Sequence, residues 1–196
     1  RVDWSGGVYA LQAQSGLTVH PAGKTALELQ GNAHYIPADL KQKRVILFGS
    51  ENEKLPAWFK TYTHDVNVRY VMTGLFEENA VLGLVAYNAG SFEINVSSPE
   101  RAVLEFCYDV PAKESFDELD QIMAGLTTLR PKMLQELLEK CGSVKVKRLF
   151  LCLAEKHGHS WVKKLNIDKM DFGTGNRSLY PHGRYNSKYK IVIPWQ

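Results

Sequence analysis

The sequence contains few cysteines and no long run of apolar residues. Its three cysteines, Cys107, Cys141 and Cys152, are odd in number, and their spacing matches no metal-binding motif. We therefore predict reduced thiols in the core of a cytoplasmic protein. The uncharged stretch at residues 79–92 contains two glycines. It is shorter than the roughly 20 apolar residues that a membrane-spanning helix requires, so we predict no membrane anchor.

The composition is that of a globular protein, with 44% hydrophobic and 23% charged residues among 196. This excludes a disordered or collagen-like chain. The first residue is Arg1 instead of Met, and the residues after it form no signal-peptide pattern. We therefore expect a fragment or a processed product of a longer protein.

Positive charge is concentrated in the C-terminal third of the sequence. Residues 1–98 contain 8 Lys and Arg against 9 Asp and Glu, and residues 99–125 contain 2 against 7. Residues 126–196 contain 14 against 5. Clustered basic residues attract anionic partners, so a polyanion or an acidic protein surface is a plausible partner for this third.

The hydrophobic pattern changes from mixed to mainly helical along the chain. We predict helices at 4–14, at 21–31, around Trp58, from 99, from 116, from 131 and from 144, strands at 44–48 and 66–72, a hairpin at 81–86 and 92–96 in the same sheet, and strand character at 178–194. The predicted fold class is α+β, with a mixed β-sheet flanked by helices, a helical C-terminal layer and a final strand pair. One compact unit is the simplest organisation, and two lobes are the alternative.

Two motifs resemble phosphate-handling sites but lack essential parts. Gly23-Lys24-Thr25 is similar to the end of a phosphate-binding loop, but Thr18 stands where the first glycine should be. Gly49-Ser50 followed by Asp65 is similar to a nucleotidyltransferase pattern, in which two carboxylates at alternate strand positions hold magnesium. The second position here is Asn67, a neutral amide. A divergent magnesium-dependent nucleotidyltransferase or nuclease that uses Asp65 is therefore only the alternative hypothesis.

Histidines provide no convincing metal or catalytic site. His157 and His159 flank a glycine and lack the four-residue spacing of a helical zinc pair. No Ser, His and Asp set can be assembled from the spacing. We predict no catalytic residue, no metal ligand and no cofactor, and hence a protein that is not an enzyme.

One helix combines an apolar stripe with a basic one. After Ser143, the residues Lys145, Arg148 and Lys156 fall opposite the apolar stripe. Lys163 and Lys164 follow in the next short helix, and Arg130 and Lys132 start the preceding helix. These seven residues are the predicted contacts with nucleic acid or a protein partner. The open alternatives are a nucleic-acid backbone, an acidic or RNA-bound protein, and a solvated helix face.

Several blocks of residues resemble the C-terminal antitoxin domain of the AbiEi family, the antitoxins and transcriptional regulators of type IV toxin–antitoxin, or abortive infection, systems. The similar blocks are residues 4–12, 20–31, 98–102, 114–131 and 143–159, and they are distributed over nearly the whole chain. Their order and coverage make chance similarity unexpected. The resemblance therefore implies that residues 1–196 form an AbiEi-like C-terminal antitoxin domain.

The resemblance also implies partners and a second domain. Family members carry an N-terminal winged helix–turn–helix that binds promoter DNA, and this domain is not found before Trp4. The expected partners are a cognate nucleotidyltransferase toxin, counteracted without a stable complex, and promoter DNA bound through the full-length protein. A homodimer, formed through apolar residues such as Trp4 and Trp195, is a third hypothesis. The family supplies no catalytic residues.

Overall fold

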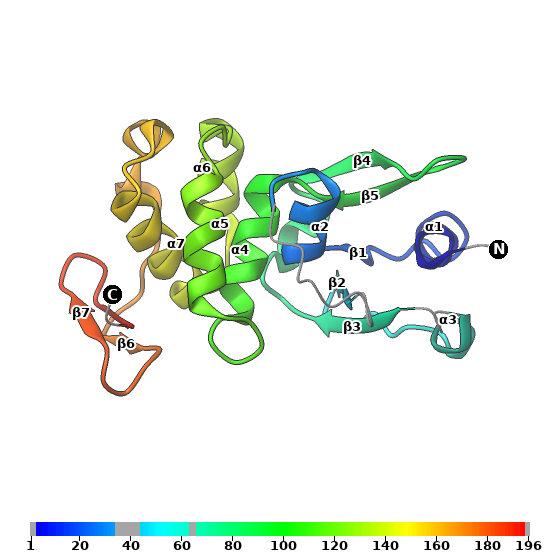
Figure 1. Ribbon diagram of the computed structural model, residues 1–196, viewed down its shortest axis with the longest axis horizontal. Helices are drawn as coiled ribbons and strands as arrows, with labels where there is room; N and C mark the ends of the chain where they lie inside the picture. The colour runs from blue at the N-terminus through cyan, green and yellow to red at the C-terminus, as the bar shows by residue number, and fades with distance from the viewer. Residues whose placement is uncertain (1–2, 34–43, 63–65, 195–196) are drawn as a thin grey trace. The chain divides into compact units, whose positions relative to one another are not determined.

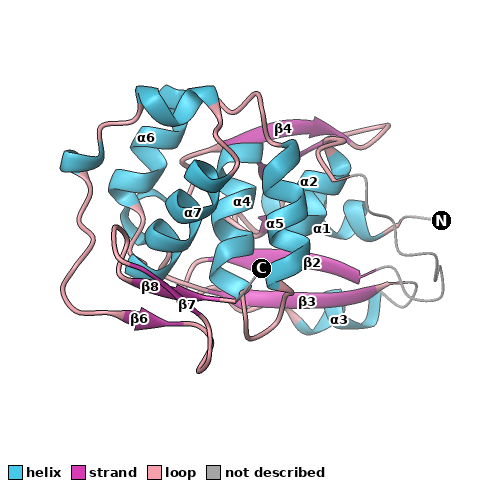
Figure 2. Cartoon of the chain, turned by 60° about the vertical axis from the view of Figure 1, so that its left-hand side comes forward, coloured by secondary structure: helices cyan, strands magenta, loops and turns pink. Residues whose placement is uncertain are grey.

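The computed structural model describes residues 3–33, 44–62 and 66–194, and the chain divides into two compact units. The units are Arg1–Ala102 and Val103–Gln196, and the boundary falls within helix α4 (Pro99–Asp109). Short helices and two sheets make up the first unit, whereas longer helices and one small sheet make up the second (Figures 1 and 2). The predicted α+β class is confirmed. Within the described ranges, no helix is both long and apolar enough to cross a membrane.

The first unit is built around a mixed three-stranded sheet. Its elements are α1 (Trp4–Ala13), β1 (His20–Pro21), α2 (Gly23–Leu29), β2 (Arg44–Gly49), α3 (Ala57–Tyr62), β3 (Asn67–Met72), η1 (Glu77–Asn79), β4 (Leu84–Asn88) and β5 (Glu93–Ser97). The sheet order is β1-β2-β3. β1 is antiparallel to β2, and β2 is parallel to β3, with Arg44 opposite Asn67 and Gly49 opposite Met72.

One cluster of the core lies on the face of the sheet that carries Val45 and Leu47 of β2, which are fully buried. Phe59 of α3 packs into the same cluster, together with Val8 of α1 and Ile94 of β5. Ile46 and Phe48, which alternate onto the other face, are buried as well. Both faces of β2 are therefore covered, which explains its continuous apolar run in the sequence.

The hairpin forms a sheet of its own, which differs from the prediction that it joins the same sheet. β4 and β5 are antiparallel, with Leu84 opposite Ser97 and Asn88 opposite Glu93. The Gln12 side chain of α1 accepts a hydrogen bond from the Asn95 backbone N–H and donates one to the Asn95 carbonyl, both at 2.9 Å. It also donates to the Val19 carbonyl at 2.8 Å. A side-chain amide thus satisfies backbone groups that a neighbouring strand would otherwise pair.

The second predicted helix begins later than its sequence pattern indicates. Pro21 lies in β1, and helix α2 starts at Gly23, whose φ of 50° favours glycine. The Thr25 hydroxyl accepts a hydrogen bond from the Ile46 backbone N–H at 2.9 Å. This bond joins the first turn of α2 to β2. Residues 20–22 lie at the edge of the sheet, and the helix begins only after them.

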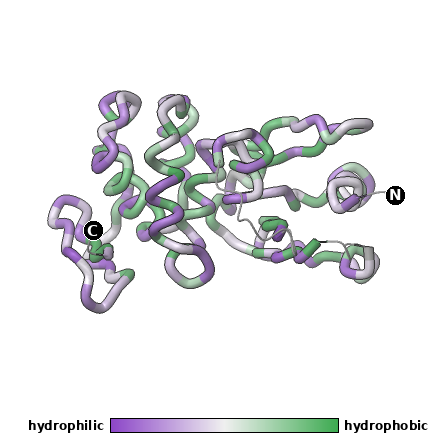
Figure 3. The backbone as a smooth tube through the Cα atoms, viewed as in Figure 1, coloured by the Kyte–Doolittle hydropathy of each residue, from purple (hydrophilic) through white to green (hydrophobic). Residues whose placement is uncertain are grey.

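The second unit contains amphipathic helices with regular N-terminal caps. Its elements after α4 are α5 (Phe116–Gly125), α6 (Pro131–Lys140), α7 (Val144–Lys156), η2 (Ser160–Lys164), η3 (Ile167–Lys169), β6 (Arg177–Ser178), β7 (Arg184–Asn186) and β8 (Ile191–Ile193). The hydroxyls of Ser115 and Ser143 cap α5 and α7, and Pro131 occupies the first turn of α6. Hydrophobic and hydrophilic residues alternate along these helices (Figure 3), and their apolar residues, such as Leu119, Leu138 and Phe150, are buried.

The last segment forms a three-stranded sheet in the order β6-β8-β7. β8 packs against α7, and Ile191, its first residue, is fully buried. The three cysteines are free and buried, as predicted. Burial raises the pKa of all three thiols, and it raises that of Cys141 to about 11. The neutral thiol is therefore the stable form, which makes these groups poor nucleophiles at neutral pH.

Candidate macromolecular interface

Arg148 was predicted to be a surface contact, but its side chain is buried. It lies in the middle of α7 and is 2% exposed. One nitrogen of its guanidinium donates to the carbonyl oxygens of Gly175 (2.7 Å) and Lys190 (3.0 Å), and another to that of Phe172 (2.7 Å). Burial and the nearby Arg177 lower the pKa of the guanidinium, although arginine stays charged in proteins. Arg148 therefore fixes the C-terminal strands to α7.

Lys145, in the first turn of α7, also binds within the protein. Its ammonium donates to the carbonyl oxygens of Tyr108 at 2.5 Å and Val110 at 2.7 Å, at the end of α4. The last carbonyls of a helix lack intrahelical partners and carry partial negative charge, so a lysine there caps the helix. Burial lowers the pKa of Lys145. The structure thus directs Lys145 and Arg148 to backbone carbonyls within the protein. Apolar periodicity alone does not show which basic side chains turn inward.

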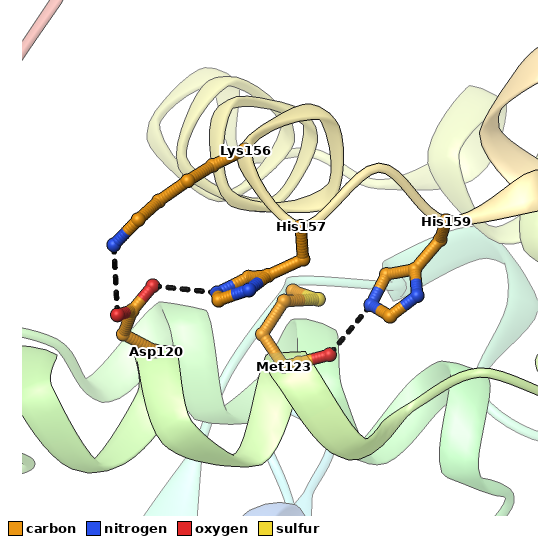
Figure 4. A network of polar contacts seen from close by, with 5 residues as sticks. All are labelled: Asp120, Met123, Lys156, His157 and His159. Atoms are coloured by element: carbon orange, nitrogen blue, oxygen red, sulfur yellow. Dashed lines mark hydrogen bonds and ion pairs between the residues drawn. The ribbon is translucent and has the colours of Figure 1, made fainter.

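Lys156 is exposed and forms an ion pair at the end of α7. Its Nζ lies 2.9 Å from one carboxylate oxygen of Asp120 on α5, and the Nε2 atom of His157 lies 2.8 Å from the other (Figure 4). His159 makes a hydrogen bond of 2.7 Å from its Nε2 atom to the Met123 carbonyl. These contacts join the end of α7 to α5. Each histidine has one ring nitrogen engaged by an oxygen of α5, so the pair is explained by packing.

The short helix η2, which carries Lys163 and Lys164, packs against α6. At one end, the indole N–H of Trp161 donates to the Leu126 carbonyl at 2.8 Å. Just beyond the other end, Gln135 of α6 accepts from the Asn166 N–H at 2.8 Å and donates to the Asn166 carbonyl at 3.0 Å. Residues 161–166 are therefore anchored to α6 and to the turn before it.

Four of the seven predicted residues remain as a basic surface in this region. We call the exposed side chains of Arg130, Lys132, Lys163 and Lys164 the α6–η2 patch. Arg130 and Lys132 start α6, and the two lysines lie between the anchors of η2. Glu136, one turn after Lys132, is also exposed and marks an acidic limit of the patch. The patch presents positive charge from two segments that are 30 residues apart in sequence.

A second basic surface lies on the C-terminal strands, where the sequence gives no site prediction. Residues 172–194 contain four Lys and Arg and no Asp or Glu. Arg177 and Arg184 are exposed on β6 and β7, and Tyr185 beside them is 47% exposed. The absence of acidic residues was the available signal, but the weak strand pattern did not show that Arg148 holds the segment on α7.

The motif at Gly49-Ser50 has a structural explanation. A Cβ atom at Gly49 would lie 2.3 Å from the hydroxyl oxygen of Tyr70, so packing alone requires glycine there. The Ser50 hydroxyl lies 3.0 Å from that of Thr18, whose N–H and hydroxyl both donate to the Glu53 carboxylate at 2.8 Å. Asp65, the proposed magnesium ligand, lies outside the described residues. Among the residues that are described, no three His, Cys, Asp or Glu side chains are grouped to hold a metal ion.

Comparison with known families gives these features a context. A family model described as a transcriptional regulator, AbiEi antitoxin, of a type IV toxin–antitoxin system matches residues 42–194. The chain belongs to the AbiEi antitoxin family. A second family model, described as the N-terminal domain of the AbiEi antitoxin transcriptional regulator, matches residues 1–38. A search of curated proteins finds no match to the chain.

The fold of this AbiEi family member is similar to a solved structure. The crystal structure of the RV2827C protein from Mycobacterium tuberculosis matches with a TM-score of 0.64 and 13% sequence identity. The match covers 98% of this chain and 68% of that chain. At this identity the likeness shows the fold alone.

AbiEi membership gives the chain a regulatory class. The family is one of regulators, and it implies a toxin as functional partner and regulatory DNA binding. The phosphate-type motifs at Thr25 and Gly49 are used for packing in this fold.

Proposed function

We propose that the chain is the antitoxin part of a type IV system and counteracts a nucleotidyltransferase toxin without forming a stable complex. The family match over residues 42–194 carries this proposal. Regulatory DNA binding by the full-length protein is the second part of this proposal. The protein acts in the cytoplasm and needs no cofactor in this proposal.

The contact surface in this proposal is the α6–η2 patch, with a nucleic-acid backbone as the preferred partner. Its side chains are exposed, and they extend from the start of a helix and from a segment anchored beside it. Flexible lysines and arginines contact phosphates without reading sequence. Lys145 and Arg148 take no part, and Lys156 stands apart because it pairs with Asp120.

Charge reversal in the patch tests whether the patch is needed for protection and whether it contacts nucleic acid. We expect Lys163→Glu/Lys164→Glu to lose protection when it is co-expressed with the toxin encoded beside its gene. In a binding assay with a DNA duplex, the slope of log affinity against log salt should fall by about 2, since two phosphate contacts are removed. Lys113→Glu/Lys140→Glu is the matched control, because both lysines are exposed and lie outside the patch.

The results separate the candidate partners. Unchanged protection and an unchanged salt slope in the patch variant would remove the patch from the function. Lost protection with an unchanged salt slope would assign the patch to an acidic protein partner. Circular dichroism of each variant checks that the fold survives.

The second candidate function is a magnesium-dependent nucleotidyltransferase or nuclease that uses Asp65. Only the Gly49-Ser50 pattern favours it, and Tyr70 explains that glycine by packing. We expect no labelled product when the protein is incubated with NTPs, tRNA and magnesium. A product that forms with the wild type and is lost in Asp65→Ala would overturn the non-enzymatic proposal.

A further inference from the structure

The first unit contains an open groove beside strand β3, separate from the α6–η2 patch. The groove has a volume of about 720 Å³ and lies between β3 and the segment 54–60. Val68, Tyr70 and Met72 line it from the strand. They occupy alternate positions and therefore point to the same side of the sheet. Leu55 and Phe59 line the opposite wall.

The strand at this groove is the last one in its sheet. In the order β1-β2-β3, only β2 pairs with β3 among the strands that the structure describes. Alternate backbone groups of a strand point to either side of it, so the far side of β3 offers a row of donors and acceptors to an added strand. β3 has six residues, which correspond to roughly 20 Å of extended chain.

The groove also has an exposed apolar anchor. Met72 is 47% exposed, although it continues the face on which Val68 and Tyr70 pack against the core. Trp58 is 41% exposed and does not line the groove, but it adjoins the lining residue Phe59, with the two rings 5.8 Å apart in an edge-on arrangement. Exposed aromatic residues and methionine are enriched where proteins bind other proteins.

Charge around the groove selects the kind of partner. Lys54 and Lys60 both line it and are exposed, and none of the lining residues is acidic. The nearby Glu53 points elsewhere, because its carboxylate accepts hydrogen bonds from Thr18. The Tyr70 hydroxyl donates to the Glu53 carbonyl at 2.6 Å, so this tyrosine presents its ring to the groove.

We propose that the groove binds an extended acidic segment of another protein. The segment pairs along the far side of β3, and its alternate apolar side chains enter the groove against Leu55 and Met72. Its acidic side chains meet Lys54 and Lys60. Strand addition of this kind combines affinity from the main chain with selectivity from side-chain pockets.

A short peptide provides the test. The probe is an acetylated and amidated heptapeptide of alternating glutamate and valine, and the comparison peptide has lysine in place of glutamate. In NMR titrations of the full chain, we expect the acidic peptide to shift amide signals of residues 57–60 and 67–72, and the lysine peptide to shift none. N-methylation at alternate residues of the acidic peptide should abolish these shifts, because it removes the donors that pair with β3.

Charge variants of the protein complete the experiment. Lys54→Glu/Lys60→Glu should weaken binding of the acidic peptide at least about tenfold, since two attractive contacts become repulsive. Lys113→Glu/Lys140→Glu, at exposed positions outside the groove, should bind as the wild type does. Equal binding of both peptides, or binding of the N-methylated peptide, would overturn the proposal. Self-association that Met72→Asp abolishes would instead assign the groove to a second copy of the chain.

Discussion

At the scale of single residues, Arg148 has the clearest structural role in the second unit. Its buried guanidinium donates to three backbone carbonyls between Phe172 and Lys190. A buried charge is tolerated when hydrogen bonds satisfy it. Its removal takes this donor from the Phe172 and Gly175 carbonyls, whereas the Lys190 carbonyl still accepts from the Arg177 backbone N–H at 2.9 Å. Arg148 thus links the packing of α7 to the position of the C-terminal strands.

Replacement of Arg148 by methionine should therefore destabilise the protein. We expect Arg148→Met to lower the free energy of unfolding by about 2 kcal/mol, because the carbonyls of Phe172 and Gly175 lose their hydrogen bonds to the guanidinium. Urea unfolding at neutral pH measures this loss, and hydrogen exchange should show faster opening of residues 177–193. The control is Arg177→Met, an exposed position where we expect a change below about 0.5 kcal/mol. Equal effects of the two substitutions would contradict the assigned role.

At the scale of secondary-structure elements, the end of β2 is fitted closely against β3. Gly49 lies opposite Met72, and the Tyr70 ring and hydroxyl occupy the space beside Gly49. The Tyr70 hydroxyl is fixed by its hydrogen bond to the Glu53 carbonyl. A side chain at position 49 must therefore displace Tyr70 or break that bond.

This close packing predicts that substitutions at Gly49 and Tyr70 have coupled effects on stability. Gly49→Ala should lower the free energy of unfolding by about 2 kcal/mol through overpacking. In a Tyr70→Phe background the same substitution should cost at least about 1 kcal/mol less, because the clashing hydroxyl is absent. Urea unfolding of the four proteins in the cycle gives the coupling. If Gly49→Ala costs the same in both backgrounds, the glycine is not required by Tyr70.

The elements also show which features of the fold local sequence patterns can predict. The caps at Ser115 and Ser143 and the strands at β2 and β3 follow from local patterns, and the structure confirms them. The separate hairpin sheet depends on Gln12, which bonds to Asn95 83 residues away. The inward turn of Arg148 depends on carbonyls 24 to 42 residues further along the chain. Such long-range contacts leave no periodic signal in the sequence.

At the scale of the whole molecule, buried thiols and phenols in both units share one electrostatic property. Burial raises the pKa of Cys141 to about 11 and that of Tyr70 to about 12. It also raises the pKa of Cys107 and Tyr189. Each group is therefore held in its neutral form by the fold and ionises more readily in the unfolded chain.

The protein should consequently lose stability in alkaline solution. Above about pH 9 the unfolded chain releases thiol protons that the folded chain retains, so the free energy of unfolding falls as pH rises. For Cys141 alone, with its pKa raised from 9.0 to about 11, the loss reaches about 2 kcal/mol at pH 10.5. Lys145 opposes this trend, because burial lowers its pKa.

A cysteine variant isolates the thiol contribution from the other titrating groups. Urea unfolding under reducing conditions at pH 8 and pH 10.5 should show a smaller loss in Cys141→Ala than in the wild type, by about 2 kcal/mol. Tyr70 and Lys145 titrate in both proteins and cancel in this difference. Cys107 cancels only in part, because Cys141 contributes to its raised pKa. Equal losses in the two proteins would mean that the Cys141 thiol ionises as readily in the folded chain as in the unfolded one, and hence that α6 does not shield it from water.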